Sequence, residues 1–157
     1  MTEREMSALN LVNRYSLYSA GVGLIPVPLV DMAGVAAIQV KMLNELAAVY
    51  DVPFSANRGK SIVAALLGGI APTSMAASGF GQLFRAIPVV GQMFGFLTVS
   101  LFATAATWAV GRVFIQHFES GGTFLNFDPA KAGKMVQDEF EKAKTAGARS
   151  KSANATA

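Results

Sequence analysis

The triplet Gly-Lys-Ser at residues 59–61 is the stretch whose residue types come nearest to catalytic machinery, because a phosphate-binding loop ends in this way. Such a loop needs another glycine five positions before the Gly of the triplet, where the backbone turns around the phosphates, and this chain has Phe54 there. No run of β-branched residues that ends on a magnesium-binding carboxylate follows downstream. We therefore expect Ser55 or Asn57 to cap a helix instead.

Candidates for acid–base or metal chemistry are few. His117 is the sole histidine and the chain has no cysteine, so neither a metal-ligand cluster nor a catalytic triad is indicated. Asp31 is a functional candidate, because an acidic group near a membrane segment is by default functional. Its place in the first turn of a predicted helix also favours the helix dipole, which is a structural role. We expect no enzymatic activity, no metal and no cofactor.

Two long uncharged runs dominate the middle of the chain. Residues 61–84 and 86–111 contain no Asp, Glu, Lys or Arg, and Arg85 is the sole charge between them. A helix needs about 20 apolar residues to cross the hydrocarbon core of a bilayer. With 52% hydrophobic and 15% charged residues, the chain is also more apolar than an ordinary soluble domain. These runs predict a membrane hairpin over residues 61–116.

A second pair of helices is predicted over residues 2–50, and it is less apolar than the first pair. These two helices either span the membrane or lie at its interface as amphipathic elements, so two to four spans are predicted. The predicted fold is all-α. Residues 1–122 then form one membrane-embedded or interfacial domain made of two hairpins.

The placement of basic residues predicts the topology. Arg58, Lys60 and Arg112 mark membrane boundaries on the side of both termini, whereas Arg85 lies at the opposite tip. All of the 13 basic residues except Arg85 fall on the side of the termini. Lys and Arg are enriched in cytoplasmic loops, so both ends of the chain are expected in the cytoplasm.

The C-terminal segment is polar. Asp128 followed by Pro129 is a helix-start signal, and a thin apolar stripe follows it. We predict a cytoplasmic amphipathic helix over residues 123–147 and a disordered basic tail over residues 148–157. The basic residues either contact an anionic leaflet or form a solvated face. Their interleaving with acidic residues argues against a nucleic-acid partner.

Small residues recur at four-residue intervals in the apolar helices, a pattern that allows helices to approach closely in lipid. Packing within one chain accounts for some of these residues, but two to four helices leave other small-residue ridges facing lipid. We predict that helix packing and self-association use five glycines: Gly68, Gly69, Gly91, Gly95 and Gly111.

A family resemblance rests on three pieces of sequence: GVGLIPVPLVDMAGVAAIQVKMLNELAAVYDV, AATWAVGRVFIQHFESGG and TFLNFD. Over residues 7–128 the chain resembles the bacterial domain of unknown function of YcjF-type inner-membrane proteins, which is also fused behind Era-like GTPase domains. The resemblance implies a membrane-embedded helical companion to GTPases in a bacterial inner membrane. Because this sequence carries no GTPase domain, such a partner is expected to be a separate protein.

These patterns together predict a non-enzymatic inner-membrane module for self-assembly and partner recruitment. Its expected partners are the lipid bilayer, further copies of the chain, and a GTPase or another cytoplasmic protein. The alternative is a small oligomeric channel or transporter, in which Asp31, Gln39 and Asn44 line a polar path between subunits.

Overall fold

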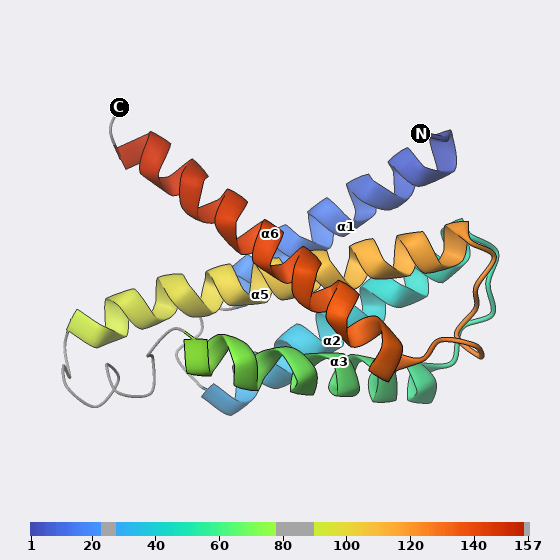
Figure 1. The fold of residues 1–157 in the computed structure, drawn as a ribbon, viewed down its shortest axis with the longest axis horizontal. Coiled ribbons are helices and arrows are strands. Elements are labelled where there is room, and N and C mark those ends of the chain that lie inside the picture. The colour runs from blue at the N-terminus through green and yellow to red at the C-terminus, as the bar shows by residue number, and fades with distance from the viewer. Residues whose placement is uncertain (23–27, 78–89, 156–157) are drawn as a thin grey trace.

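The computed structural model describes residues 1–22, 28–77 and 90–155, and this part of the chain contains five helices and no strand (Figure 1). The predicted all-α fold is confirmed. The helices, labelled as in Figure 1, are α1 (Glu3–Val22), α2 (Pro28–Val49), α3 (Ala56–Ala77), α5 (Val90–Glu119) and α6 (Pro129–Ala155).

The helix starts follow local sequence signals. Asp128 caps α6, because its Oδ1 accepts the backbone N–H of Ala130 at 3.0 Å, and Pro129 occupies the first helical position. Ser55 precedes α3, and its carbonyl accepts the backbone N–H of Gly59 at 2.8 Å. The Gly-Lys-Ser triplet at residues 59–61 therefore belongs to the first turns of a helix rather than to a loop.

Two helices end in the same left-handed turn. Beyond α2, Asp51 has φ of 56°, and the N–H of Val52 donates to the carbonyl of Ala47 at 2.8 Å. Beyond α5, Gly121 has φ of 82°, and the N–H of Gly122 donates to the carbonyl of His117 at 2.9 Å. Both turns satisfy carbonyls that the helix end leaves open, in the Schellman arrangement.

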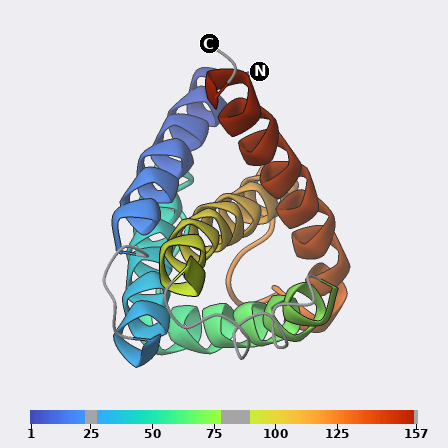
Figure 2. The same ribbon diagram turned by 90° about the vertical axis from the view of Figure 1, so that its left-hand side faces the viewer.

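Helix α5 occupies the centre of the bundle, and the other helices surround it (Figure 2). It packs mainly against α1 and α6, while α3 packs against α2 and α6 and touches α5 only slightly. Among the described residues, α3 and α5 therefore have little direct contact. Instead, small residues on α5 allow α1 to come close to it, and these contacts supply much of the buried core.

Helix α6 is longer than the sequence pattern indicates. The predicted end near Gly147 and the predicted disordered tail over 148–157 are wrong for the described residues, because α6 continues to Ala155. Gly147 does not end the helix. It allows close packing instead, since a Cβ atom at this position would lie 2.7 Å from Cδ1 of Leu101 on α5.

None of the helices in the described part of the chain combines the length and the apolar character that a membrane crossing requires. The spans within residues 2–50 and 61–116 stay predictions.

Candidate functional site

The uncharged half of α5 presents two different stripes to its surroundings. Ala103, Thr107 and Gly111 are buried and lie one turn apart, whereas Thr104 and Trp108 on the neighbouring stripe are partly exposed. The buried stripe faces α1. A Cβ atom at Gly111 would lie 2.6 Å from both methyl groups of Val12, so even an alanine meets this side chain. We call this α1–α5 contact the seam.

A polar cluster lies inside the seam and connects it to α2. Ser19 of α1, Thr107 of α5 and Gln39 of α2 are each 0% exposed. The hydroxyl oxygens of Ser19 and Thr107 are 2.8 Å apart, and Nε2 of Gln39 donates to Thr107 Oγ1 at 3.3 Å. Three helices are thus joined by neutral side chains within the core.

The proton arrangement of this cluster follows from the number of donors. The Ser19 hydroxyl has one proton and donates it to the backbone carbonyl of Tyr15 at 3.1 Å. Thr107 must therefore donate to Ser19 while it accepts from Gln39. Oε1 of Gln39 is buried with no hydrogen-bond partner. A neutral cluster of this kind fixes helix register, and it contains no titratable side chain that could act as a general base.

Two tyrosine–carboxylate contacts lie outside the cluster. The hydroxyl of Tyr15 donates to Glu45, which also pairs with Arg14 at 3.0 Å. The hydroxyl of Tyr50 donates to Oε1 of Glu119 at 2.6 Å, which joins the ends of α2 and α5. Burial, followed by the hydrogen bond to Glu119, raises the pKa of Tyr50 above its ordinary value. The phenol therefore stays neutral near pH 7 and acts as a donor.

His117 belongs to an aromatic cluster at the end of α5. Phe114 stacks on Phe127 with ring centroids 4.3 Å apart, and the His117 ring packs against the edge of Phe127. Nε2 of His117 lies 2.9 Å from the carbonyl of Thr123. Gly122 has no room for a side chain, because a Cβ there would overlap the imidazole. The histidine thus holds the turn after α5 in place.

The polar residues expected on α2 do not come together. Gln39 is buried in the cluster, whereas Asn44 is exposed on a different face of the same helix. Five residues correspond to 500° of rotation along a helix, so these two positions point about 140° apart. Within one chain, these two side chains therefore face different surroundings. The side chain of Asp31 lies outside the described residues.

The glycines and boundary cations are also distributed among different environments. Gly111 serves packing within the chain, while Gly68 has open space around it. Arg58 donates to the carbonyl of Phe124 at 3.4 Å, Lys60 is exposed and Arg112 is partly buried. Four of the predicted positions have surroundings outside the described residues: Gly69, Arg85, Gly91 and Gly95.

Sequence reasoning missed Ser19 and Thr107 as members of a polar cluster. Thr107 is recognisable from the chain as one of the small residues spaced by four, but this spacing gives no sign of a hydrogen-bonding role. Among the described residues, no group of three His, Cys, Asp or Glu side chains is arranged to hold a metal ion.

The fold and the seam define a helical bundle with a neutral polar interior, and comparisons place this bundle among known proteins. The family model described as domain of unknown function DUF697 matches residues 1–145, and the chain belongs to this family. The predicted resemblance to a bacterial family of unknown function is thereby confirmed. The chain is also 35% identical over 148 residues to magnetosome membrane protein 22 of Magnetospirillum gryphiswaldense, covering 94% of this chain and 76% of that protein. No solved structure matches the chain significantly.

Proposed function

We propose that the protein is a non-enzymatic, membrane-associated helical module whose uncharged end enters a bacterial inner membrane. The observation that carries this proposal is the arrangement of the uncharged runs. From Ser61 onward, α3 runs to the same end of the molecule as the first half of α5 (Figure 1). Both parts fall in the runs 61–84 and 86–111, which contain no charge.

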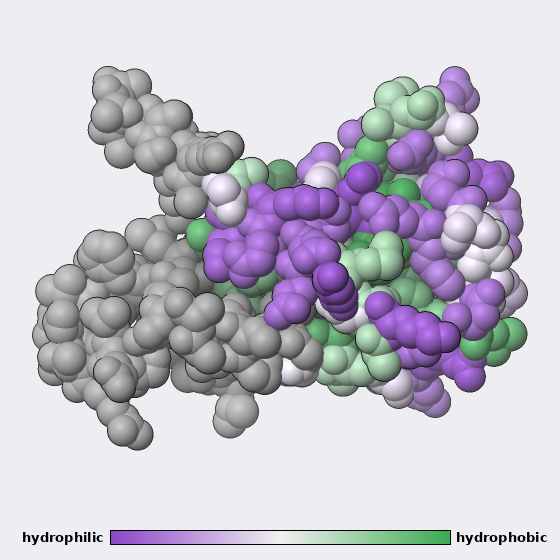
Figure 3. Space-filling model, viewed as in Figure 1, coloured by the Kyte–Doolittle hydropathy of each residue, from purple (hydrophilic) through white to green (hydrophobic). Residues whose placement is uncertain are grey.

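The opposite end supports the proposal by contrast. Hydrophilic residues predominate on the side of the molecule where α2 and α5 finish, with some hydrophobic residues among them (Figure 3). The Tyr50–Glu119 contact lies at this end, and Arg4 pairs there with Asp51 at 3.5 Å. The name of the relative from Magnetospirillum gryphiswaldense, a membrane protein, agrees with a membrane location.

A non-enzymatic role agrees with the polar chemistry of the described residues. The buried polar groups are neutral and mostly engaged with one another, while the ion pairs lie on the surface. This arrangement provides register and shape rather than acid–base chemistry.

We propose further that the charged end faces the cytoplasm and recruits a protein partner. The start of α1 and the start of α6 lie at this end, whereas α6 runs back over α5 and its C-terminal end lies toward the uncharged end of the molecule (Figure 1). Leu125 is 82% exposed in the turn before α6, and Met135 on α6 is 46% exposed. Exposed apolar side chains of this kind suit a protein partner, for which a separate GTPase is the proposed class.

Self-association remains part of the proposed function, but it cannot use the seam. The space beside Gly111 is filled by Val12 of the same chain, whereas Gly68 on α3 is exposed and has open space around it. A second copy is therefore proposed to pack on the α3 side of the uncharged end.

A charge placed in the uncharged run tests the membrane proposal. Ala65 and Asn57 are both exposed on α3, but Ala65 lies inside the run and Asn57 precedes it. An ionised carboxylate in a bilayer costs several kcal/mol, of the order of 3. Ala65→Glu should reduce flotation with phosphatidylglycerol–phosphatidylcholine vesicles, while Asn57→Glu should float as the unaltered protein does. Equal flotation of the two variants, or no flotation of the unaltered protein, contradicts the proposal.

A further inference from the structure

An open groove runs beside the seam, on the other stripe of α5. Its floor is formed by Leu101, Ala105 and Trp108 of α5. Leu17 of α1 forms one wall, and Ala146 belongs to the α6 wall. The two helices stand apart above α5 in Figure 2, and the groove has a volume of about 510 Å³. This size lies in the range of small-molecule sites, which is about 300–1,000 Å³.

The groove is apolar and continues the uncharged end of the molecule. Its floor falls within residues 86–111, the run without charge, and Leu17 is 70% exposed on its wall. A hydrophobic side chain so exposed beside a half-buried tryptophan favours an apolar occupant. The floor belongs to the part of α5 that leads toward the end proposed to enter the bilayer.

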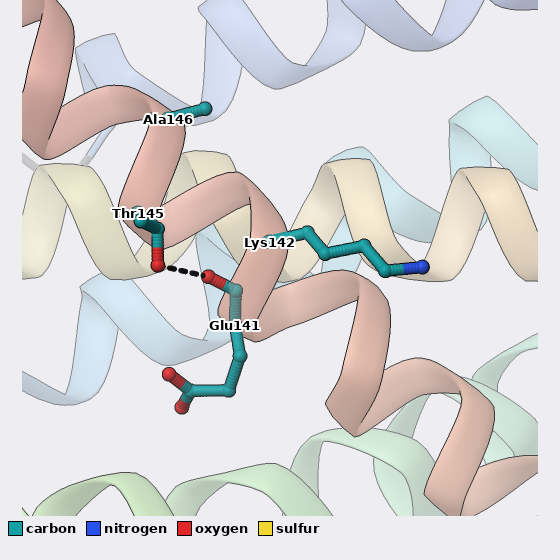
Figure 4. A pocket seen from close by; sticks show the side chains of 4 residues that line it. All are labelled: Glu141, Lys142, Thr145 and Ala146. Carbon is teal, nitrogen blue, oxygen red and sulfur yellow. Dashed lines mark hydrogen bonds between the residues drawn. The ribbon is translucent and has the colours of Figure 1, made fainter.

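The rim of the groove is cationic. Lys142 lines both this groove and a neighbouring hollow on the outer side of α6, in which Glu141 points away from the lysine (Figure 4). Lys142 also pairs with Glu139 at 2.9 Å; the lysine side chain is 70% exposed and that of Glu139 is 15% exposed.

From Lys142 onward the sequence contains four cations and no carboxylate side chain, and the continuation of α6 to Ala155 places these cations on a helix. Arg149 follows Lys142 by seven residues, about two turns, so the two positions share a helix face.

We propose that the groove between α1 and α6 binds an acyl chain of an anionic phospholipid, whose phosphate pairs with Lys142 at the rim. This proposal deepens the proposed membrane association and rests on it. The apolar floor accepts the chain, and the basic second half of α6 matches the charge of the headgroup.

Trp108 makes the proposal directly measurable, because it is the only tryptophan of the chain and lies in the groove floor. Vesicles are prepared with bromine on the acyl chains of either phosphatidylglycerol or phosphatidylcholine, at the same overall composition. Bromine quenches tryptophan fluorescence on contact. Brominated phosphatidylglycerol should cause the larger loss of Trp108 fluorescence.

Two matched pairs of variants locate the effect. Ala146→Phe fills the groove and should reduce the quenching, whereas Ala130→Phe on an exposed position of the same helix should not. Lys142→Gln should remove the preference for phosphatidylglycerol, whereas Lys131→Gln at the other end of α6 should preserve it. Circular dichroism establishes that each variant keeps its helices.

Flotation separates the two proposals. Protein that fails to float with vesicles overturns the membrane association, and this proposal with it. Protein that floats without quenching, or whose quenching is unchanged by Ala146→Phe, overturns the lipid groove alone. Equal quenching by the two brominated lipids overturns the choice of an anionic headgroup. In the absence of lipid, Trp108 could become more protected as the protein concentration rises. That result would assign the groove to a second copy of the chain and overturn the proposal.

Discussion

The seam and the groove lie on adjacent stripes of the same uncharged stretch of α5, yet one is closed and the other is open. In the seam, Gly111 brings α5 against Val12, and Thr107 bonds across to Ser19. In the groove, Trp108 is only half-buried and Leu17 stands exposed above it. The difference indicates that one uncharged stretch of helix can pack closely against protein on one stripe and remain open on the next. The closed stripe determines the fold, and the open stripe is left for an occupant.

Replacing the glycine of the seam by a larger residue should have the largest effect on this comparison. Gly111→Leu places a side chain where a Cβ alone would be 2.6 Å from Val12, so α1 must move away. Overpacking of a core costs about 1–3 kcal/mol and occasionally more. We expect a clearly lower urea midpoint by circular dichroism.

Gly68→Leu is the matched control for this change, because Gly68 on α3 has nothing within 4 Å. It should leave the midpoint unchanged or raise it slightly, since glycine is the poorer helix former by roughly 1 kcal/mol relative to alanine. Equal losses at the two glycines would show that the seam is not specially close-packed.

The hydroxyl of Thr107 offers a smaller perturbation of the seam. Thr107→Val keeps the shape but removes a group that bonds to both Ser19 and Gln39. Leaving buried polar groups without partners costs about 1–3 kcal/mol. Thr104→Val, one turn away on the groove side, removes only a bond to the carbonyl of Ser100 in its own helix, so it should cost less. A Thr104→Val loss as large as that of Thr107→Val would contradict the buried cluster.

The pH dependence of stability should sharpen the comparison further, because the polar cluster of the seam has no titratable side chain. Tyr50, beyond the cluster, has a folded-state pKa raised above its ordinary value. Its contribution is therefore present below about pH 10, the usual tyrosine value, and is lost as pH rises through the folded-state pKa. The urea midpoint should fall as pH increases above 10.

Tyr50→Phe serves as the control for this titration and should make the fall less steep. Some of the fall should remain, because Tyr15 makes a similar contact with Glu45. An unchanged slope in Tyr50→Phe would show that the contact with Glu119 does not influence stability in this pH range.

The helix starts and the fold class could be predicted from the sequence, because the signals are local. The Asp128–Pro129 pair indicates a helix start from two adjacent residues, and the lack of strand patterns is also read from short stretches of sequence. The partners of each face could not be predicted in this way. Thr107 and Gln39 are 68 residues apart, and the spacing of small residues does not reveal whether a ridge faces α1, a second chain or lipid. The predicted end of the last helix near Gly147 is wrong for the same reason, because Leu101, which packs against Gly147, is distant in sequence.

The central claim is that the uncharged end of α3 and α5 enters a bilayer while the charged end remains in water. Because the chain has no cysteine, single cysteines at Ala65 and Asn57, both exposed on α3, can carry an environment-sensitive fluorophore such as nitrobenzoxadiazole. On addition of phosphatidylglycerol-containing vesicles, the emission of the probe at Ala65→Cys should shift to the blue and gain intensity. The probe at Asn57→Cys should change little. The same small response at both positions, with the protein bound to the vesicles, would contradict the account.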